Sequence, residues 1–445
     1  MNRLSLAATL TAALAGTLLL AGGCTTRDRL NPLDPANSET RGAIPGFGAI
    51  AANGLVELRW TPLTQKGVAA YAVHRWKPGG TPAPLPGAVF GPASSGTLDL
   101  DVVNDSTYLY RLVARFTYGD SAVSLPDSAT PGARFVSILG ADPSSVLGLS
   151  PDARDVISAV PAANAYEDFD LDRDRGVLWL SDPVSGTILR RGMNGEVAGL
   201  TLVVPGVTDV SISNLRGVGW IASPEQQRIQ AFGPDLNDPT PRFIISGLGH
   251  ARVVEAGTLD PSVWIGNDEG TVFRVSPTDG SLLEQWNVQA PVRAIALDQA
   301  DRSAWVVTIR GSTNDLYHLV PGDTNAVAKR VGLENVADVE VETVTRTLWV
   351  SERGRPRFAA GRVSRLAADG STIATLAGLE PYGLTVESGR DHVWVCDLTS
   401  NRVYELDANA SVVRRSPPLG VPYGILIRDG MAVAAPLVRS RRGIR

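Results

Sequence analysis

The stretches "LWLSDPVSGTILRR" at 178–191 and "VWVCDLTSNRVYELD" at 393–407 share one pattern. In both, a tryptophan lies in a short apolar segment, a polar turn follows, and a second apolar segment comes after it. This pattern predicts two antiparallel strands joined by a turn. The tryptophan recurs at intervals of 41, 44, 41, 44 and 45 residues, at Trp179, Trp220, Trp264, Trp305, Trp349 and Trp394.

Apolar side chains also recur ten and eight residues before each tryptophan, for example Phe169 and Leu171 before Trp179. The constant gap predicts that one hairpin is repeated, and a second pair of strands often follows it, as in "GTVFRVSPTDGSLLEQW". Four strands in each 40–50 residues is the period of a β-propeller. The sequence therefore predicts an all-β propeller over 132–445.

The two ends of this region predict how the propeller closes. The outer strands of an incomplete repeat fit 146–160, and a hairpin without outer strands fits 424–437. Together they would complete one blade, which removes two free sheet edges. Seven blades would then share 314 residues at about 45 each, matching the tryptophan spacing; six blades, at about 52 each, remain the alternative.

The quoted repeats resemble NHL repeats and, more loosely, the SMP-30/gluconolactonase and YncE-like propellers. The SMP-30 resemblance implies a divalent cation held in part by Glu167 and Asp182. The family's Gly-Pro after the glutamate is Asp168-Phe169 here, and its ligand asparagine is replaced by Tyr382. The ligand set is therefore incomplete, and we expect no cofactor, with a divalent cation as the alternative.

Acidic residues lie nine or eleven positions before several of the tryptophans. Alternation along a strand places them opposite its apolar stripe, on the innermost strand of each repeat. They could line the central channel and bind a cation or a basic ligand, or they could only be solvated; Arg252 and Arg293 could pair with them. These candidates are Asp168, Asp170, Asp209, Glu255, Asp338 and Glu340.

The N-terminal residues 1–23 have the features of a secretory signal: a positively charged start, an apolar middle and small residues before Cys24. The stretch "LLLAGGCTT" resembles a bacterial lipobox, which implies that Cys24 is lipidated. A membrane-spanning helix is the alternative, but the polar stretch after Cys24 argues against it. We expect a lipid-anchored protein of the cell envelope, at the outer membrane, either periplasmic or surface-exposed.

Residues 24–42 are polar, carry two prolines and show no apolar periodicity, which predicts a flexible tether. Alternating strands separated by Gly/Pro turns fill 43–131, as in "GLVELRW" and "YLYRLVARF". This segment resembles a fibronectin type III β-sandwich, with Tyr108 at the tyrosine-corner position. His74 and Trp76 are expected on its outer face.

Composition and the absence of known motifs limit the classes of function that we expect. The net charge of −5 gives no reason to expect a nucleic-acid partner, and the two cysteines exclude a disulfide framework if Cys24 is acylated. No nucleophile-elbow, zincin, P-loop or Rossmann motif is present. We expect a monomeric, non-catalytic lipoprotein that binds an envelope protein, a glycan or a small ligand, or acts as a scaffold. The rival hypothesis is a propeller enzyme, either a metal-dependent hydrolase of the gluconolactonase type or a lyase.

Overall fold

The computed structural model describes residues 31, 33–35, 37, 40–132, 134–173, 175–192, 195–213, 217–257, 262–354, 360–387 and 390–428. The chain forms two compact units, Met1–Pro131 and Gly132–Arg445. All regular elements in these residues are β-strands, as the all-β prediction requires. None of the described residues forms a helix that could cross a membrane.

The first unit consists of two antiparallel sheets. One has the order β1-β2-β5, and the other has the order β4-β3-β6-β7 with β8 also paired to β6. Both sheets have an apolar inner face, which gives the unit its core. The strands are β1 (Gly48–Ala52), β2 (Leu55–Arg59), β3 (Val68–Trp76), β4 (Ala83–Phe90), β5 (Gly96–Asp99), β6 (Tyr108–Phe116), β7 (Ser121–Val123) and β8 (Asp127–Ala129).

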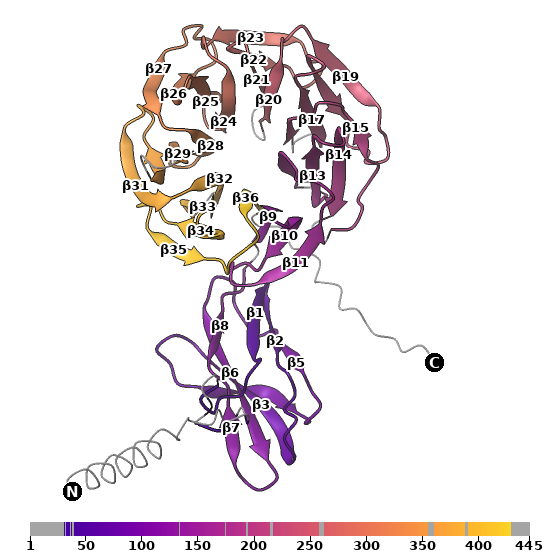
Figure 1. Cartoon of the computed structure of the whole chain (residues 1–445), viewed down its shortest axis with the longest axis vertical. Helices are drawn as coiled ribbons and strands as arrows, with labels where there is room; N and C mark the ends of the chain where they lie inside the picture. The colour runs from indigo at the N-terminus through magenta and orange to yellow at the C-terminus, as the bar shows by residue number, and fades with distance from the viewer. Residues whose placement is uncertain are drawn as a thin grey trace, which may run out of the picture. The chain divides into compact units, whose positions relative to one another are not determined.

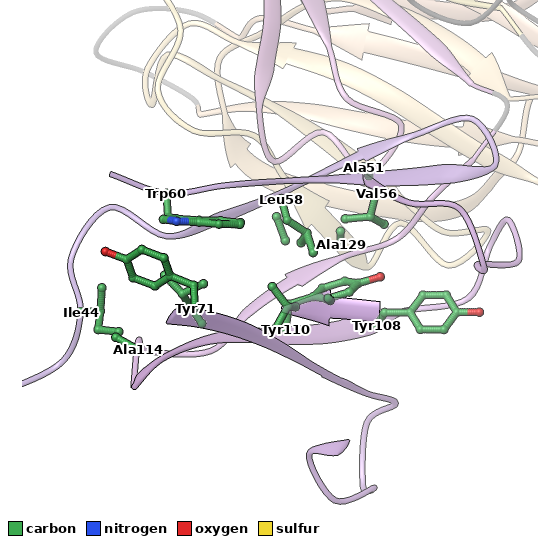
Figure 2. Packing of buried hydrophobic residues seen from close by; sticks show 14 of the residues in the cluster. Ile44, Ala51, Val56, Leu58, Trp60, Tyr71, Tyr108, Tyr110, Ala114 and Ala129 are labelled. Carbon is green, nitrogen blue, oxygen red and sulfur yellow. The ribbon is translucent and has the colours of Figure 1, made fainter. Parts of the chain in front are cut away.

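The core of the first unit follows the predicted alternation along the strands. Trp60, Tyr71 and Tyr110 lie inside with Leu58 and Ala114, as Figure 2 shows. Burial of this apolar surface is the main stabilising contribution to the unit. Asp99, a buried carboxylate beside this core, accepts hydrogen bonds from Arg75 at 2.8 Å and from the Tyr110 hydroxyl at 2.9 Å.

The second unit contains seven four-stranded antiparallel sheets in its described residues. Figure 1 shows them arranged in a ring, which supports the propeller prediction. The first three, from the innermost strand outward, are β12 (Phe169–Asp172), β13 (Val177–Asp182), β14 (Thr187–Gly192) and β15 (Leu202–Val203); β16 (Asp209–Ser213), β17 (Val218–Ser223), β18 (Arg228–Phe232) and β19 (Pro241–Ser246); and β20 (Ala251–Ala256), β21 (Val263–Asn267), β22 (Thr271–Val275) and β23 (Leu282–Asn287).

The next three sheets repeat this order. Every one of them again runs outward from the centre in chain order. They are β24 (Val292–Asp298), β25 (Ser303–Arg310), β26 (Thr313–Leu319) and β27 (Ala328–Leu333); β28 (Val336–Glu342), β29 (Thr347–Glu352), β30 (Gly361–Leu366) and β31 (Thr372–Leu379); and β32 (Pro381–Glu387), β33 (His392–Asp397), β34 (Arg402–Leu406) and β35 (Val412–Arg415).

The last sheet joins the two ends of the unit, and we call it the closing sheet. Its order is β11-β10-β9-β36, with β9 (Phe135–Ala141), β10 (Ser144–Leu149), β11 (Val156–Pro161) and β36 (Pro422–Arg428). The innermost strands contact one another in order, and β36 contacts β12, so the ring is closed. Closure through both ends of the unit was predicted from the sequence.

The predicted share of each end was wrong. We expected the hairpin at 424–437 to supply both inner strands, but β9 occupies the second position, between β36 and β10. Only the first strand of that hairpin lies in the described residues. The position that holds tryptophan in the other sheets is Ser137 in β9, because Leu426 pairs with Ser137 as Thr385 pairs with Trp394. Without the tryptophan, the sequence pattern gave no sign of this strand.

The six repeated tryptophans fill the apolar layers between neighbouring sheets. Each indole is at most 2 % exposed. Trp220, for example, lies in one cluster with Val254 and Ile265 of the next sheet, and Trp349 with Leu384 and Val395. Each ring therefore links two sheets through apolar contact.

Candidate functional site

The six acidic residues singled out from the sequence lie at the centre of the ring. Asp170 belongs to the innermost strand β12, Asp209 to β16 and Glu255 to β20, while Asp338 and Glu340 belong to β28; Asp168 directly precedes β12. All six are half-buried: some solvent reaches them, although protein atoms surround them closely. The structure thus brings together the acids that the spacing predicted.

Two of these carboxylates bind the backbone of the next sheet. Asp168 Oδ2 accepts a hydrogen bond from the Val210 N–H at 3.0 Å, and Asp170 Oδ2 accepts one from the Ile212 N–H at 2.6 Å. Val210 and Ile212 lie on an innermost strand, whose inner edge has no further strand to pair with. Unpaired backbone N–H groups are costly when buried, so these carboxylates satisfy a need created by the fold.

The same arrangement recurs around the ring. Asp209 Oδ2 accepts from the Val254 N–H at 2.7 Å, and the Ser211 hydroxyl accepts from the Ala256 N–H at 3.0 Å. On the other side, Asp338 Oδ2 accepts from the Leu384 N–H at 2.9 Å. These side chains hold neighbouring sheets together at the ring centre, a role that their spacing alone did not reveal.

Burial and mutual repulsion raise the pKa values of several of these carboxyl groups toward or above neutrality. Burial raises the pKa of Asp170 to about 6, that of Asp338 to about 7 and that of Glu340 to about 8. The pKa of Glu255 is raised well above its ordinary value by burial and then by Asp170 and Glu340. An uncharged carboxyl can still accept a backbone hydrogen bond, so protonation and the contacts between sheets are compatible.

Asp168 and Asp209 form a hydrogen-bonded pair of carboxyl groups. Such a bond requires a proton on one partner, and burial together with Asp209 raises the pKa of Asp168 well above its ordinary value. The proton belongs to the pair, because two charged carboxylates this close would repel each other. The pair therefore links three successive sheets through its two backbone acceptor bonds.

Of the two arginines that could pair with these acids, only Arg293 acts on a central carboxyl group. Arg252 pairs with Asp268, at 2.8 and 3.0 Å, so its predicted pairing with the central acids is wrong. Arg293 is exposed, and its charge lowers the pKa of Asp338 against the larger effect of burial. The central acids are therefore only weakly neutralised by these two arginines.

The two residues that the SMP-30 resemblance assigned to a metal site have different surroundings. Glu167 is exposed. Asp182 is buried at the end of β13, where it accepts hydrogen bonds from the Val184 and Ser185 N–H groups and from Asn164 Nδ2. These bonds lower the pKa of Asp182 against the opposing effect of burial. Its carboxylate thus stabilises a turn.

One group of three possible metal ligands was missed in the sequence. Among the described residues, Glu387, His392 and Glu405 offer ligand atoms within 4.8 Å of one another. His392 begins β33, and its Nδ1 atom contacts Glu405 at 2.7 Å. They lie on three successive strands, and the pairing of β32 with β33 and of β33 with β34 brings them together.

Arginine side chains already pair with the two glutamates of this group. Arg134 lies 3.2 Å from Glu387 and 3.4 Å from Glu405, Arg390 contacts Glu387 at 3.0 Å, and Arg414 contacts Glu405 at 3.4 Å. Trp394 also donates its indole N–H to Glu387 at 3.1 Å. With three arginines present, the cluster is electrostatically satisfied as a network joining β32–β34 to the closing sheet.

Only one of the two cysteines lies in the part of the chain that the structure describes. Cys24 lies outside the described residues. Cys396 is buried in the interface between β33 and the closing sheet and forms no disulfide. Burial raises the pKa of its thiol well above the ordinary value, so Cys396 is an inert apolar side chain.

Comparison with known proteins identifies the fold and nothing finer. No protein-family model matches the chain, and no curated protein does. Hydrazine synthase from Kuenenia stuttgartiensis, a propeller-containing protein, matches over 58% of this chain and 88% of its own, with a TM-score of 0.51 and 9% identity. A protein of unknown function from Desulfotomaculum acetoxidans matches over 66% of this chain and 99% of its own, with a TM-score of 0.53 and 12% identity. At such low identity these likenesses show a shared β-propeller architecture.

Proposed function

We propose that this chain is a non-catalytic lipoprotein of the cell envelope that binds or scaffolds partners through a seven-bladed β-propeller. The main support for this proposal is what the central carboxylates bind. Asp168, Asp170, Asp209 and Asp338 accept backbone hydrogen bonds from neighbouring sheets, so these acids serve the fold. Binding then falls to the exposed faces of the two units.

The proposal includes a fibronectin type III module in the first unit. Its support is the two-sheet arrangement and the Tyr108 hydroxyl, which accepts a hydrogen bond from the Val103 N–H at 3.0 Å. A tyrosine at this corner that bonds the upstream backbone is typical of such sandwiches. Modules of this kind serve as spacers or as binding domains.

Two experiments test the proposal separately. Growth with a palmitate analogue should label the wild-type protein and leave Cys24→Ser unlabelled; equal labelling would contradict the lipid anchor. Cross-linking of the wild-type chain in intact envelopes should then yield one reproducible envelope partner. A variant with an unfolded propeller, such as Trp349→Ala if it fails to fold, serves as the control that must lose that partner.

The alternative function is a propeller enzyme, a metal-dependent hydrolase of the SMP-30/gluconolactonase type or a lyase. One observation favours it: Asp338 and Glu340 have pKa values of about 7 and 8, and such neighbours are suited to general acid–base chemistry. A panel of lactones, assayed with and without a chelator, tests this alternative. Turnover that is lost in Glu340→Gln or Glu167→Ala would replace the non-catalytic proposal.

A further inference from the structure

The outer face of the larger sheet in the first unit carries a group of cationic and aromatic side chains. His74 and Trp76 alternate outward on β3, while Tyr71 and Val73 point into the core. On β6, Arg111 and Arg115 point outward for the same reason, because side chains alternate between the two faces of a strand. The register pairs His74 with Arg111 and Ala70 with Arg115, so the four side chains share one surface. We call it the basic face: His74, Trp76, Arg111 and Arg115.

The cations of the basic face have no anionic partner in the described part of the chain. No carboxylate pairs with Arg111 or Arg115, unlike Arg75 on the same strand as His74, which binds Asp99. Arg111 instead lies over the Trp76 ring, 6.0 Å from its centroid. The Nε atom of Arg111 and the Nδ1 atom of His74 are shielded from solvent without a hydrogen-bond partner.

The neighbouring strands add no negative charge to this face. The residues that pair with its outward positions are Pro84 and Val89 on β4, and Ser121 and Val123 on β7. Val89 and Val123 are exposed. Burial and then the charges of Arg111 and Arg115 lower the pKa of His74, so the histidine is neutral and the two arginines carry the charge.

We infer that the basic face binds the anionic surface of a lipid bilayer. Two unpaired arginines match phosphate-bearing headgroups, and a half-buried tryptophan on the same sheet face as exposed valines suits the boundary between headgroups and acyl chains. In the cell this rests on the proposed anchor at Cys24: the 24 residues from there to Gly48 span at most about 80 Å, which keeps the unit within reach of the membrane.

The test uses the chain from residue 24 onward with Cys24→Ser, so that it does not depend on acylation. At low ionic strength this protein should co-sediment with phosphatidylcholine vesicles that contain about one third phosphatidylglycerol, and it should not co-sediment with pure phosphatidylcholine. Raising the salt should release it, because exposed charges are screened. Binding that is equal on both kinds of vesicle, or absent from both, overturns the inference.

Variants then locate the surface. Arg111→Ala with Arg115→Ala should lower the partition coefficient by about 30-fold, since each arginine near an anionic bilayer contributes about fivefold. The matched control, Arg59→Ala with Arg415→Ala, removes the same charge from exposed sites elsewhere and should change partitioning by less than about threefold. Unchanged circular dichroism verifies that both variants are folded. Equal losses in the two variants would mean nonspecific charge attraction and would contradict the proposed face.

Brominated lipids give an independent readout. They should quench part of the tryptophan fluorescence on binding, and Trp76→Phe should abolish that quenching, because the other tryptophans with a described burial lie in the cores. Quenching that persists in Trp76→Phe would place the contact elsewhere. Palmitate labelling of Cys24 is a separate measurement, so a failure of the anchor and a failure of the basic face are distinguishable.

Discussion

The interface between β28–β31 and β32–β35 differs from the interface at which the closing sheet meets β12–β15. At the first, Trp349 is fully buried against Leu384, with the Arg365 guanidinium 5.8 Å from its ring centroid. At the second, the matching positions hold Ser137 and its cross-strand partner Gly148. The repeat therefore supplies a large ring and a covering side chain at one interface and two small residues at the other.

A hollow lies where these large side chains are missing. Its lining includes Ser137, Gly148, Val160, Leu178 and Leu180, and the space that a water-sized sphere can reach in it is about 10 Å³, room for about one water molecule. Packing at this interface depends instead on Leu139, Phe169, Leu171 and Tyr166. The closing interface is therefore less completely filled, which leaves pairing of β36 with β9 to hold the ring shut.

Removing that pairing should have the largest effect. A chain that ends at residue 421 lacks β36, which leaves β9 as an exposed sheet edge and removes Ile425 and Ile427 from the core. We expect aggregation or rapid proteolysis, measured by size-exclusion chromatography and limited digestion. A chain that ends at Arg428 keeps every described strand and is the control. A stable monomer without β36 would contradict closure through this strand.

Trp349→Ala should cost about 3–5 kcal/mol of unfolding free energy, because a buried indole is lost and a cavity remains. Trp305→Ala should cost a similar amount, since Trp305 is only 2 % exposed and packs against Val339 and Leu348. Denaturant titration measures both. Ser137→Ala, at the matching position of the closing sheet, should change stability by less than about 1 kcal/mol. Losses below about 1 kcal/mol for both tryptophans would assign them to a binding role.

Asp338→Ala should cost about 1–3 kcal/mol, because the Leu384 N–H loses its acceptor at the ring centre. Asp338→Asn keeps an acceptor oxygen and should cost less. Denaturant titrations near pH 3.5 come closest to isolating the hydrogen bond, because the carboxyl, with a folded pKa of about 7, is then largely uncharged in both the folded and the unfolded state. Equal effects of the two substitutions would argue against the backbone contact as the source of stability.

The ring centre should make the protein less stable as the pH rises. Folding raises the pKa values of Asp170, Asp338 and Glu340 to about 6, 7 and 8, so the folded state holds protons that the unfolded state releases above about pH 4. This stability is complete below the unfolded pKa and is lost as the pH passes through the folded values. We expect a decline between pH 5 and 8, of up to about 1.4 kcal/mol per pH unit for each proton, and Glu340→Gln should reduce it. A rising curve would contradict these protonation states.

The smallest expected effect is an increase in the free energy of unfolding from a substitution at the closing interface. Ser137→Val places two methyl groups beside the hollow on a strand, where β-branched residues are favoured. We expect a stabilisation of about 0.5–1 kcal/mol in denaturant titration. The same substitution should not change the exposed faces. A loss of stability would show that Ser137 is already well packed.

The sequence by itself determined the repeat, the all-β class and the burial of the tryptophans. These follow from periodicity, because a side chain repeated at one position of each hairpin must meet the same neighbours each time. It also predicted that the two ends of the unit share one sheet. It did not identify β9, since Ser137 lacks the repeated ring by which the other second strands were recognised.

Only the tertiary structure decided what the central acids do. Spacing placed Asp168, Asp209 and Asp338 on the innermost strands, but whether they face solvent, a cation or a backbone N–H depends on the neighbouring sheet. The free inner edge of each innermost strand exposes N–H groups that the sequence does not display, and the carboxylates of the preceding sheet reach them. The grouping of Glu387, His392 and Glu405 with arginines depends in the same way on strand pairing and ring closure, which bring distant residues together.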